Sequence, residues 1–453
     1  MGFPPGPTIP QFKNSVARGQ TPHLLGFGDS ITSLAYSDAT AGNFRKIANE
    51  SAGHMTWLNV LSRRRFAYDP YAGPQNGFPA LSDNHGVIGE TTTQMLARIS
   101  FAIARRPDIV VLMAGTNDIG AGSAGPDIWN RLRSIIDQFN AAGARVVAVP
   151  ITPRGSVNWD AMGSAAVQRK LRVSWVNNQL IGYARVNPGL IIADPRNAIT
   201  AATGLAGGTG TRPMLLDNLH PSPEGAYNIG KAIWRALSAI LPPVEPPFYD
   251  GLDAYDATDN PTGELLNNPG FTGGTTGGMG GSVTGVVPSG WFASCTTLTA
   301  GTVVASIENP RTDTGYGVRS VVTITGATSA SNGTFSMNQK VIVGTSVVPG
   351  DRVAASCDIE VGASIDIIGT TLLINETDGS GSTVTYSELD GTSPYRNPAE
   401  TWSGVFQSPT VTVRPSGGAG ERALSVQLNV EWLSNTPATA TVKIGTIHLR
   451  KVV

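Results

Sequence analysis

Apolar and polar positions change their spacing about halfway along the chain. In the first half, short apolar runs alternate with stretches in which apolar residues recur every three or four positions. Short apolar runs favour buried strands, and the longer period favours helices that pack on a sheet. Such alternation predicts a flavodoxin-like three-layer α/β/α sandwich with a parallel sheet. Strands are expected near 23–28, 84–88, 108–114, 144–150 and 189–193, and helices over 127–142, 160–184 and 222–241.

From about residue 265 the helical period disappears. Between Leu424 and Trp432 every second residue is apolar, so that one face of the segment is hydrophobic. This alternation, with Gly, Ser, Asn and Asp between the runs, is typical of short antiparallel strands. Eight or so such strands predict an all-β antiparallel sandwich or jelly roll. They are expected near 318–325, 335–343, 351–361, 368–375, 382–388, 404–413, 424–432 and 439–450.

Breaks in this pattern divide the 453 residues into four parts. Residues 1–20 carry prolines and glycines without a sustained apolar run, so we expect an N-terminal extension that is not a signal peptide. Residues 21–241 form the α/β domain. Prolines from 242 onward cannot continue a helix and favour a stiff connection, so 242–264 is interpreted as a linker. Residues 265–453 form the β domain.

A serine directly follows the first predicted strand. The tripeptide Gly28-Asp29-Ser30 comes after an apolar run, and Asp217 and His220 lie three residues apart far downstream. A serine hydroxyl becomes a good nucleophile when an imidazole removes its proton and a carboxylate orients that imidazole. A spacing of three lets the carboxylate reach the imidazole within one turn. Together the three side chains predict acyl-transfer chemistry.

Two segments between these residues offer donors for a developing oxyanion. Gly89 follows the predicted strand 84–88, and its bare backbone N–H can approach a substrate oxygen closely. Asn117 follows the strand near 108–114, so its amide is expected at the carboxyl edge of the sheet, where open α/β sheets bind ligands. Asp29 is interpreted as a turn or cap residue, and Asp118 as a buried partner of nearby backbone.

The four segments Gly-Asp-Ser, an isolated Gly, Gly-x-Asn-Asp and Asp-x-x-His, in this order, resemble the SGNH (GDSL-type) hydrolase family over about residues 22–241. The resemblance implies that Ser30 is the nucleophile and His220 the general base, oriented by Asp217. It also implies an oxyanion hole made by the N–H groups of Ser30 and Gly89 and the Asn117 amide. Glu90 departs from the family pattern, in which a smaller polar residue often follows the glycine. This departure leaves the shape and charge of the cleft open.

The start of the β domain resembles the opening of jelly-roll carbohydrate-binding modules. The resemblance rests on residues 264–271 and 287–291. Four aromatic residues are candidates for stacking on sugars, although packing in the core is the preferred interpretation for each: Trp291, Trp402, Tyr395 and Tyr386. The glycine-rich stretch 273–281 is interpreted as a flexible connection.

Other chemistries have weaker signals. No His-Glu-x-x-His, Cys-x-x-Cys or EF-hand spacing occurs, so we expect neither a metal nor another cofactor. Nucleotide binding is not expected, because the third glycine of a dinucleotide fingerprint would fall at Ile31. His85 is considered for a substrate-side role, an ordinary loop histidine being the preferred interpretation. Whether Cys295 and Cys357 pair stays open.

Composition narrows the partners. The net charge is −1 and only 14% of residues are charged, so no basic face is expected to attract nucleic acid. No stretch of about 18 apolar residues is present to span a membrane. Many Thr and Gly residues and eight Trp residues suit an exposed protein that faces a polysaccharide.

These features predict a serine esterase that removes short acyl groups, above all O-acetyl, from a carbohydrate polymer. An extracellular or virion-associated location and a homo-oligomer would be compatible with this activity. Two alternatives stay open. One is a catalytically inactive glycan-binding protein or virion tail component, and the other is a lipase or thioesterase that acts on small esters.

Overall fold

The computed structural model describes residues 21–41, 44–70, 82–156, 163–201, 206–209, 212–241, 253–312, 317–328, 331–391, 393–415, 420–434 and 438–452. The predicted N-terminal extension and residues 242–252 of the predicted linker lie outside the described residues. The chain forms two compact units. The first comprises Met1–Ala35 and Ala52–Val244, and the second comprises Tyr36–Ser51 and Glu245–Val453.

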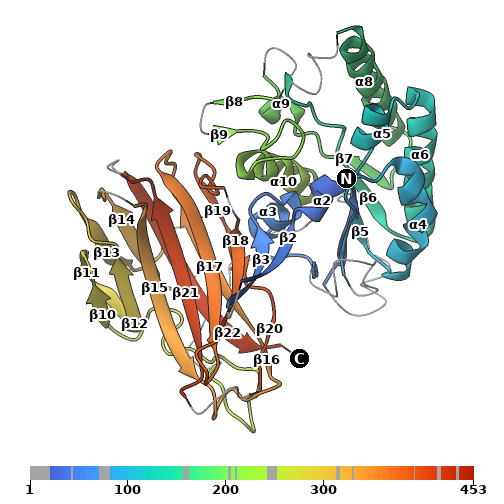
Figure 1. Cartoon of the computed structure of the whole chain (residues 1–453). Helices are drawn as coiled ribbons and strands as arrows, with labels where there is room; N and C mark the ends of the chain where they lie inside the picture. Colours follow the sequence, from blue (N-terminus) through green and yellow to red (C-terminus); the bar gives the residue numbers. More distant parts are fainter. Residues whose placement is uncertain are drawn as a thin grey trace, which may run out of the picture. The chain divides into compact units, whose positions relative to one another are not determined.

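The first unit is built on a parallel sheet of five strands (Figure 1). The strand order is β4-β1-β5-β6-β7, which is the flavodoxin-like order 2-1-3-4-5. The predicted α/β fold class is therefore confirmed. The carboxyl ends of the neighbouring strands β1 and β5 form the topological switch point, where ligands bind in folds of this kind. The strands are β1 (Leu24–Gly28), β4 (Asn84–Gly86), β5 (Ile109–Met113), β6 (Arg145–Ala148) and β7 (Leu190–Ile192).

Helices cover both faces of this sheet (Figure 1). Successive strand residues point to opposite faces, so Val110 and Leu112 join one core while Val111 and Met113 join the other. The first core contains α4 (Thr92–Ala104), α6 (Gly125–Ala141) and α8 (Ser164–Ala184), and the second contains α3 (His54–Leu61) and α10 (Pro223–Ser238). The shorter elements are α2 (Ser30–Ser33), α5 (Thr116–Ala121), α9 (Arg196–Ile199), β8 (Gly208–Thr209) and β9 (Arg212–Pro213).

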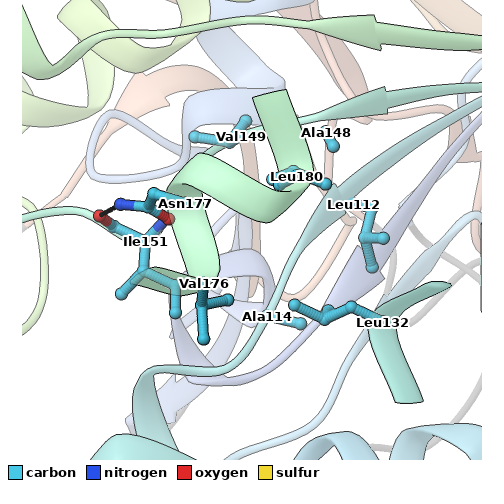
Figure 2. A pocket seen from close by; sticks show the side chains of 9 residues that line it. All are labelled: Leu112, Ala114, Leu132, Ala148, Val149, Ile151, Val176, Asn177 and Leu180. Atoms are coloured by element: carbon cyan, nitrogen blue, oxygen red, sulfur yellow. Dashed lines mark hydrogen bonds between the residues drawn. The ribbon is translucent and has the colours of Figure 1, made fainter. Parts of the chain in front are cut away.

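A buried amide fixes the segment that leaves β6. The Asn177 side chain of α8 accepts a hydrogen bond from the Ile151 N–H (2.8 Å) and donates one to the Ile151 carbonyl oxygen (3.0 Å) (Figure 2). Beside this amide lies a cavity of about 10 Å³, otherwise lined by aliphatic side chains of α6, α8, the strands β5 and β6 and the residues that follow these strands. Its volume is at the lower limit for one water molecule. The Asn177 amide thus satisfies both backbone groups of Ile151, as a neighbouring strand would, and this holds the segment after β6 in place.

The second unit consists of two sheets in which most neighbouring strands are antiparallel. The predicted all-β fold class is confirmed, and the narrower assignment to a jelly roll stays a prediction. One sheet contains, in spatial order, β10 (Thr276–Gly280), β12 (Val287–Cys295), β15 (Gly333–Ile342), β21 (Ala423–Trp432), β17 (Ile367–Thr377), β18 (Thr383–Asp390), β3 (Phe44–Glu50) and β2 (Tyr36–Ala41). The other contains β11 (Val283–Gly285), β13 (Val303–Glu308), β14 (Arg319–Ile324), β22 (Ala440–Lys451), β16 (Arg352–Val361) and β19 (Trp402–Gln407), with β20 (Val411–Thr412) paired to β16.

The hairpin β2–β3 belongs to the second unit, although the predicted domain boundaries assign its residues to the α/β domain. Strand β3 runs parallel to β18, and Ile47 and Ala48 are buried there. Lys46 Nζ lies 2.7 Å from an oxygen of Asp390, and the Asn49 amide donates to Glu388 (2.5 Å). The sequence analysis missed this hairpin because its partners lie more than 300 residues away along the chain.

Two further expectations for the second unit are resolved. The glycine-rich stretch 273–281 is not simply a flexible connection, because it contains the edge strand β10. The two cysteines, Cys295 and Cys357, are both free thiols. None of the helices in the described part of the chain has the length and apolar character needed to cross a membrane.

Three of the four aromatic candidates for sugar stacking are core residues. Trp291, Trp402 and Tyr386 are exposed by only 2%, 3% and 7%, and the Trp291 indole donates to the Asn268 carbonyl oxygen (3.0 Å). Tyr395 is half-buried. The packing interpretation is therefore correct for the three buried residues.

Candidate active site

Ser30 is the first residue of α2, directly after β1. The Asp29 side chain caps this helix by accepting a hydrogen bond from the Ile31 N–H (3.0 Å). Gly28 is required just before it, because a Cβ there would overlap the Thr32 side chain and lie 2.6 Å from the Met113 carbonyl oxygen. The tight turn sets Ser30 at the carboxyl edge of the sheet beside β5.

His220 and Asp217 occupy a tight loop ahead of α10. The loop is closed by the Leu216 N–H, which donates to the His220 carbonyl oxygen (2.8 Å), and Asn218 adopts a left-handed conformation with φ 69°. Asparagine tolerates this conformation better than most residues. The Ser222 side chain then caps α10 by accepting from the Gly225 N–H (3.1 Å).

These three residues are brought together in one hydrogen-bonded chain. His220 Nε2 lies 2.8 Å from Ser30 Oγ, and His220 Nδ1 lies 2.7 Å from Asp217 Oδ2. The Ser30 residue is 6% exposed, whereas the Asp217 side chain is 57% exposed. The sequence expectation of a Ser–His–Asp arrangement thus corresponds to a real spatial cluster, with its carboxylate at the solvent side.

Asp217 is held in its ionised form. Partial burial raises its pKa, but hydrogen bonds from the His220 N–H, the His220 ring and the Leu219 N–H outweigh this effect, so that the net pKa lies below the usual value. A carboxylate at Nδ1 favours the tautomer in which Nε2 accepts a proton from the serine.

Two backbone N–H groups and one side-chain amide are the predicted donors of the oxyanion hole. Within the described part of the chain, the N–H groups of Ser30 and Gly89 donate to no protein acceptor. Gly89 has φ 78°, and the space around its Cα is open within 4 Å of an added Cβ. Asn117 Nδ2 donates one hydrogen bond to the Glu90 carbonyl oxygen (2.9 Å), and a primary amide has a second N–H to offer.

Glu90 does not place its charge in the cleft. Its carboxylate turns inward and pairs with the buried Arg98 at 2.6 Å. Arg98 also donates to the carbonyl oxygens of Gly28 (3.1 Å) and His85 (3.0 Å). Glu90, the residue that departs from the family pattern, thus has a structural role, because its ion pair with Arg98 fixes the turn after Gly89 relative to the end of β1.

The remaining predicted residues have supporting positions. Asp118 is 1% exposed and accepts hydrogen bonds from the N–H (2.8 Å) and hydroxyl (2.7 Å) of Thr92, so it is the buried backbone partner that we expected. His85 lies in strand β4 and not in a loop, and it is 3% exposed. Burial, followed by the nearby Arg98 charge, lowers the pKa of His85 to about 4. A substrate-side role for His85 is therefore wrong.

The sequence analysis missed Arg154, a buried guanidinium on the segment after β6. It donates to the Thr116 hydroxyl through Nη2 (2.8 Å) and Nε (3.1 Å) and to the Thr116 carbonyl oxygen (2.5 Å), directly before Asn117. The next residue, Gly155, donates its N–H to the Asn218 carbonyl oxygen (2.9 Å). Arg154 and Gly155 therefore connect the Asn117 helix to the loop of Asp217 and His220. The only sequence signal for Arg154 was its place a few residues after the strand β6, which ends at Ala148.

Asp29 carries a buried charge that costs stability. It is fully buried, its Oδ2 has no hydrogen-bond partner among the described residues, and burial raises its pKa to about 6. A raised carboxyl pKa means that the folded state binds the proton more tightly than the unfolded chain, so stability falls as pH rises from about 4 to about 6.

We expect Asp29→Asn to stabilise the first unit at pH 8. Asparagine is an equally good N-cap, and the shift from 3.8 to about 6 corresponds to at most about 3 kcal/mol. Urea unfolding curves at pH 8 and pH 5 measure the effect. The gain should be clearly smaller at pH 5, where the folded Asp29 is largely protonated. An equal gain at both pH values would contradict the assigned cause.

Among the residues that the structure describes, no group of three or more His, Cys, Asp and Glu side chains is arranged to hold a metal ion. The groups available for chemistry at the site are therefore a hydroxyl, an imidazole, a carboxylate and an amide. The hydrogen-bonded hydroxyl, imidazole and carboxylate lie at the switch point of the parallel sheet, where α/β folds bind ligands.

Comparison with known families identifies the class of this domain. Residues 27–227 match the model of the GDSL-like Lipase/Acylhydrolase family, a range that contains Ser30, Gly89, Asn117, Asp217 and His220. The chain therefore carries a GDSL-like lipase/acylhydrolase domain. No curated protein matches the chain significantly.

Solved structures of similar proteins cover about half of this chain. A GDSL-like lipase from Bacteroides thetaiotaomicron VPI-5482 is 16% identical, with a TM-score of 0.34, over 51% of this chain and 98% of its own. A family 3 carbohydrate esterase from Clostridium thermocellum is 16% identical, with a TM-score of 0.34, over 49% and 97%. An acetylxylan esterase from Geobacillus stearothermophilus is 16% identical, with a TM-score of 0.31, over 48% and 94%.

Proposed function

We propose that the first unit is a serine esterase that hydrolyses short acyl esters, above all O-acetyl groups on a polysaccharide. The observation that carries the proposal is the continuous hydrogen-bonded chain from Asp217 through His220 to Ser30. This order of partners is the one that nucleophilic acyl transfer requires.

In the first half of the proposed reaction, Ser30 Oγ attacks the ester carbonyl carbon while its proton moves to His220 Nε2. The carbonyl oxygen becomes an oxyanion and accepts hydrogen bonds from the Ser30 and Gly89 N–H groups and the Asn117 amide. The C–O bond to the alcohol then breaks, and His220 returns the proton to the leaving oxygen. The products are the free alcohol and an acyl ester on Ser30.

In the second half, water takes the place of the alcohol. His220 Nε2 accepts one proton from the water as its oxygen attacks the acyl carbonyl, and the same donors hold the second oxyanion. Collapse of this intermediate releases the carboxylic acid and returns the proton to Ser30 Oγ. Asp217 stays ionised throughout and stabilises the transient imidazolium.

The nature of the acyl group can be tested by chain length. Ile88, next to Gly89, and Leu216, next to Asp217, are 80% and 52% exposed, an observation that favours longer acyl chains as the alternative. Rates with p-nitrophenyl acetate and palmitate compare the two directly. We expect the acetate ester to be cleaved faster than the palmitate ester. We also expect acetate to be released from acetylated polysaccharides. Equal or faster cleavage of the palmitate ester would contradict the acetyl assignment.

Asn117→Ala should lower kcat by about 10²–10³-fold, because it removes one oxyanion donor. Arg154→Met should lower kcat by about 10–100-fold, since Arg154 acts by holding the start of the Asn117 helix. In the double variant, the Arg154 effect should largely disappear.

The control for this double-mutant cycle of Asn117→Ala and Arg154→Met is Arg172→Met. Arg172 donates to the carbonyl oxygen of Gly122 at the other end of the same helix (2.9 Å), and kcat should be unchanged. Steady-state kinetics with p-nitrophenyl acetate measure kcat for the wild type and for these four variants. Fully additive effects of Arg154→Met and Asn117→Ala would show that Arg154 does not work through Asn117.

A further inference from the structure

A flat aromatic ring lies on one face of the eight-stranded sheet of the second unit. Phe292 on β12 is 44% exposed. A Cβ on Gly278 would lie 2.7 Å from Cδ2 of its ring, and a Cβ on Gly280 would lie 2.9 Å from Cζ. These glycines are two residues apart on β10 and share one side of that strand. The ring therefore lies beside these two glycines of the edge strand and stays partly exposed.

Amide and hydroxyl side chains continue this face across the next strands. Phe292 pairs with Asn338 on β15, which pairs with Gln427 on β21. In the adjacent row, Ser294 pairs with Ser336, which pairs with Asn429. Residues two apart on a strand share a face, so both rows lie on the side of the Phe292 ring. We call these six residues the Phe292 strip: Phe292, Ser294, Ser336, Asn338, Gln427 and Asn429.

The polar groups of the Phe292 strip are ordered but incompletely buried. The Gln427 amide donates to Asn429 Oδ1 (2.6 Å), and the hydroxyls of Ser294 and Ser336 lie 3.1 Å apart. The side chains other than the ring are half-buried. Amides and hydroxyls both donate and accept hydrogen bonds. The donors and acceptors that remain on the strip therefore suit a ligand whose own groups also donate and accept.

The Phe292 strip carries no charge. The flanking charged residues on the same strands have partners of opposite sign: Lys340 pairs with Glu421, and Glu431 lies 2.6 Å from Arg396. An uncharged strip does not favour an anionic or cationic ligand. A lone ring among hydrogen-bonding groups also lacks the apolar centre of a protein interface.

We propose that the Phe292 strip is a binding surface for a neutral polysaccharide. The apolar C–H face of a sugar would lie on the Phe292 ring, whose π-face is partially negative, and the hydroxyls at the sugar edge would bond to Asn338 and Gln427. The claim that the bound polymer also carries the ester rests on the proposed function of the first unit. The claim that the Phe292 strip binds a polymer is independent of it.

Affinity electrophoresis of the full chain tests this proposal. The Ser30→Ala variant is run in native gels that contain a xylan, a glucomannan or a mixed-linkage β-glucan, with polygalacturonate as the anionic comparison. Using this variant separates binding from turnover, so failure of the esterase proposal leaves the result unaffected. We expect retardation in at least one neutral gel and none that is specific to polygalacturonate.

Two phenylalanines provide the matched variants, each added to the Ser30→Ala chain. Phe292→Leu still covers the glycines but has no π-face, and it should weaken binding at least about tenfold, which corresponds to about 1.4 kcal/mol. Phe44→Leu changes an equally exposed ring (44%) on β3 of the same sheet and should leave binding unchanged. Thermal melting checks that both variants stay folded, and Asn338→Ala should weaken binding as well.

Absence of retardation in every neutral gel would overturn the proposal. Equal retardation of the Phe292→Leu variant and its parent would also overturn it, because the ring would then be only a cover for the β10 glycines. Retardation by polygalacturonate alone would show that charge, and not the Phe292 strip, governs binding.

Discussion

Ser30→Ala is expected to abolish hydrolysis of p-nitrophenyl acetate, with kcat falling by about 10⁶-fold. The hydroxyl supplies the electron pair that forms the acyl bond, and no neighbouring side chain in the hydrogen-bonded chain can replace it. His220→Ala should have a similar effect, since Oγ then keeps its proton. Because the two groups act as a unit, the double variant should be no worse than either single one. Steady-state kinetics after exhaustive purification measure all three.

The control for this pair is a change that leaves the charge arrangement intact. Thr92→Ser keeps the hydroxyl that donates to Asp118 and should retain activity within a few-fold. If Ser30→Ala kept a substantial fraction of the activity while remaining folded, the nucleophile would have to be another residue.

Removal of everything after residue 241 is expected to yield insoluble or inactive protein. The hairpin of residues 36–51 would then lose β18, its partner in the second unit, and would expose the buried Ile47 and Ala48 together with an unpaired strand edge. Full exposure of a side chain such as Ile47 costs about 1.5–3 kcal/mol, and an open edge promotes aggregation. The hairpin begins three residues after α2, the helix that carries Ser30. Soluble yield and esterase activity measure the effect.

A second truncated variant distinguishes this cause from a general need for the second unit. The ends of the hairpin are neighbours, since Tyr36 pairs with Asn49, and a Cβ on Gly53 would collide with Ala35. Residues 36–51 can therefore be replaced by two glycines that join Ala35 to Ala52. We expect this bridged form of residues 21–241 to be soluble and active on p-nitrophenyl acetate. An equally insoluble bridged form would contradict the role given to the hairpin.

Local patterns were sufficient for much of the first unit. The apolar runs of β1 and β5 and the period of α10 mark buried elements whose partners follow within the same pattern. The Gly-Asp-Ser and Asp-x-x-His segments identified Ser30 and His220 because their spacing reflects a local turn on each side of the site. Helix α4 was missed although its capping box, with Thr91 and Gln94, is visible in the sequence.

The features that escaped prediction depend on distant partners. Strand β3 is defined by β18, and the role of Arg154 is defined by Thr116, 38 residues away. Glu90 left the shape and charge of the cleft open, because its pairing with Arg98 is not visible in the sequence. Phe292 was not predicted to be a stacking residue, because only the register of β10 and β12 reveals that two glycines lie beside its ring. In each case the missing information was a pairing between segments.

The central claim is that His220 activates the Ser30 hydroxyl, and covalent labelling tests it most directly. The full chain is treated with a fluorophosphonate, and peptide mapping by mass spectrometry locates the adduct. The account predicts one adduct per chain, on Ser30, with a labelling rate that falls at least about a hundredfold in His220→Ala. An adduct on another residue, or none on Ser30 in a protein that still hydrolyses p-nitrophenyl acetate, would contradict the account.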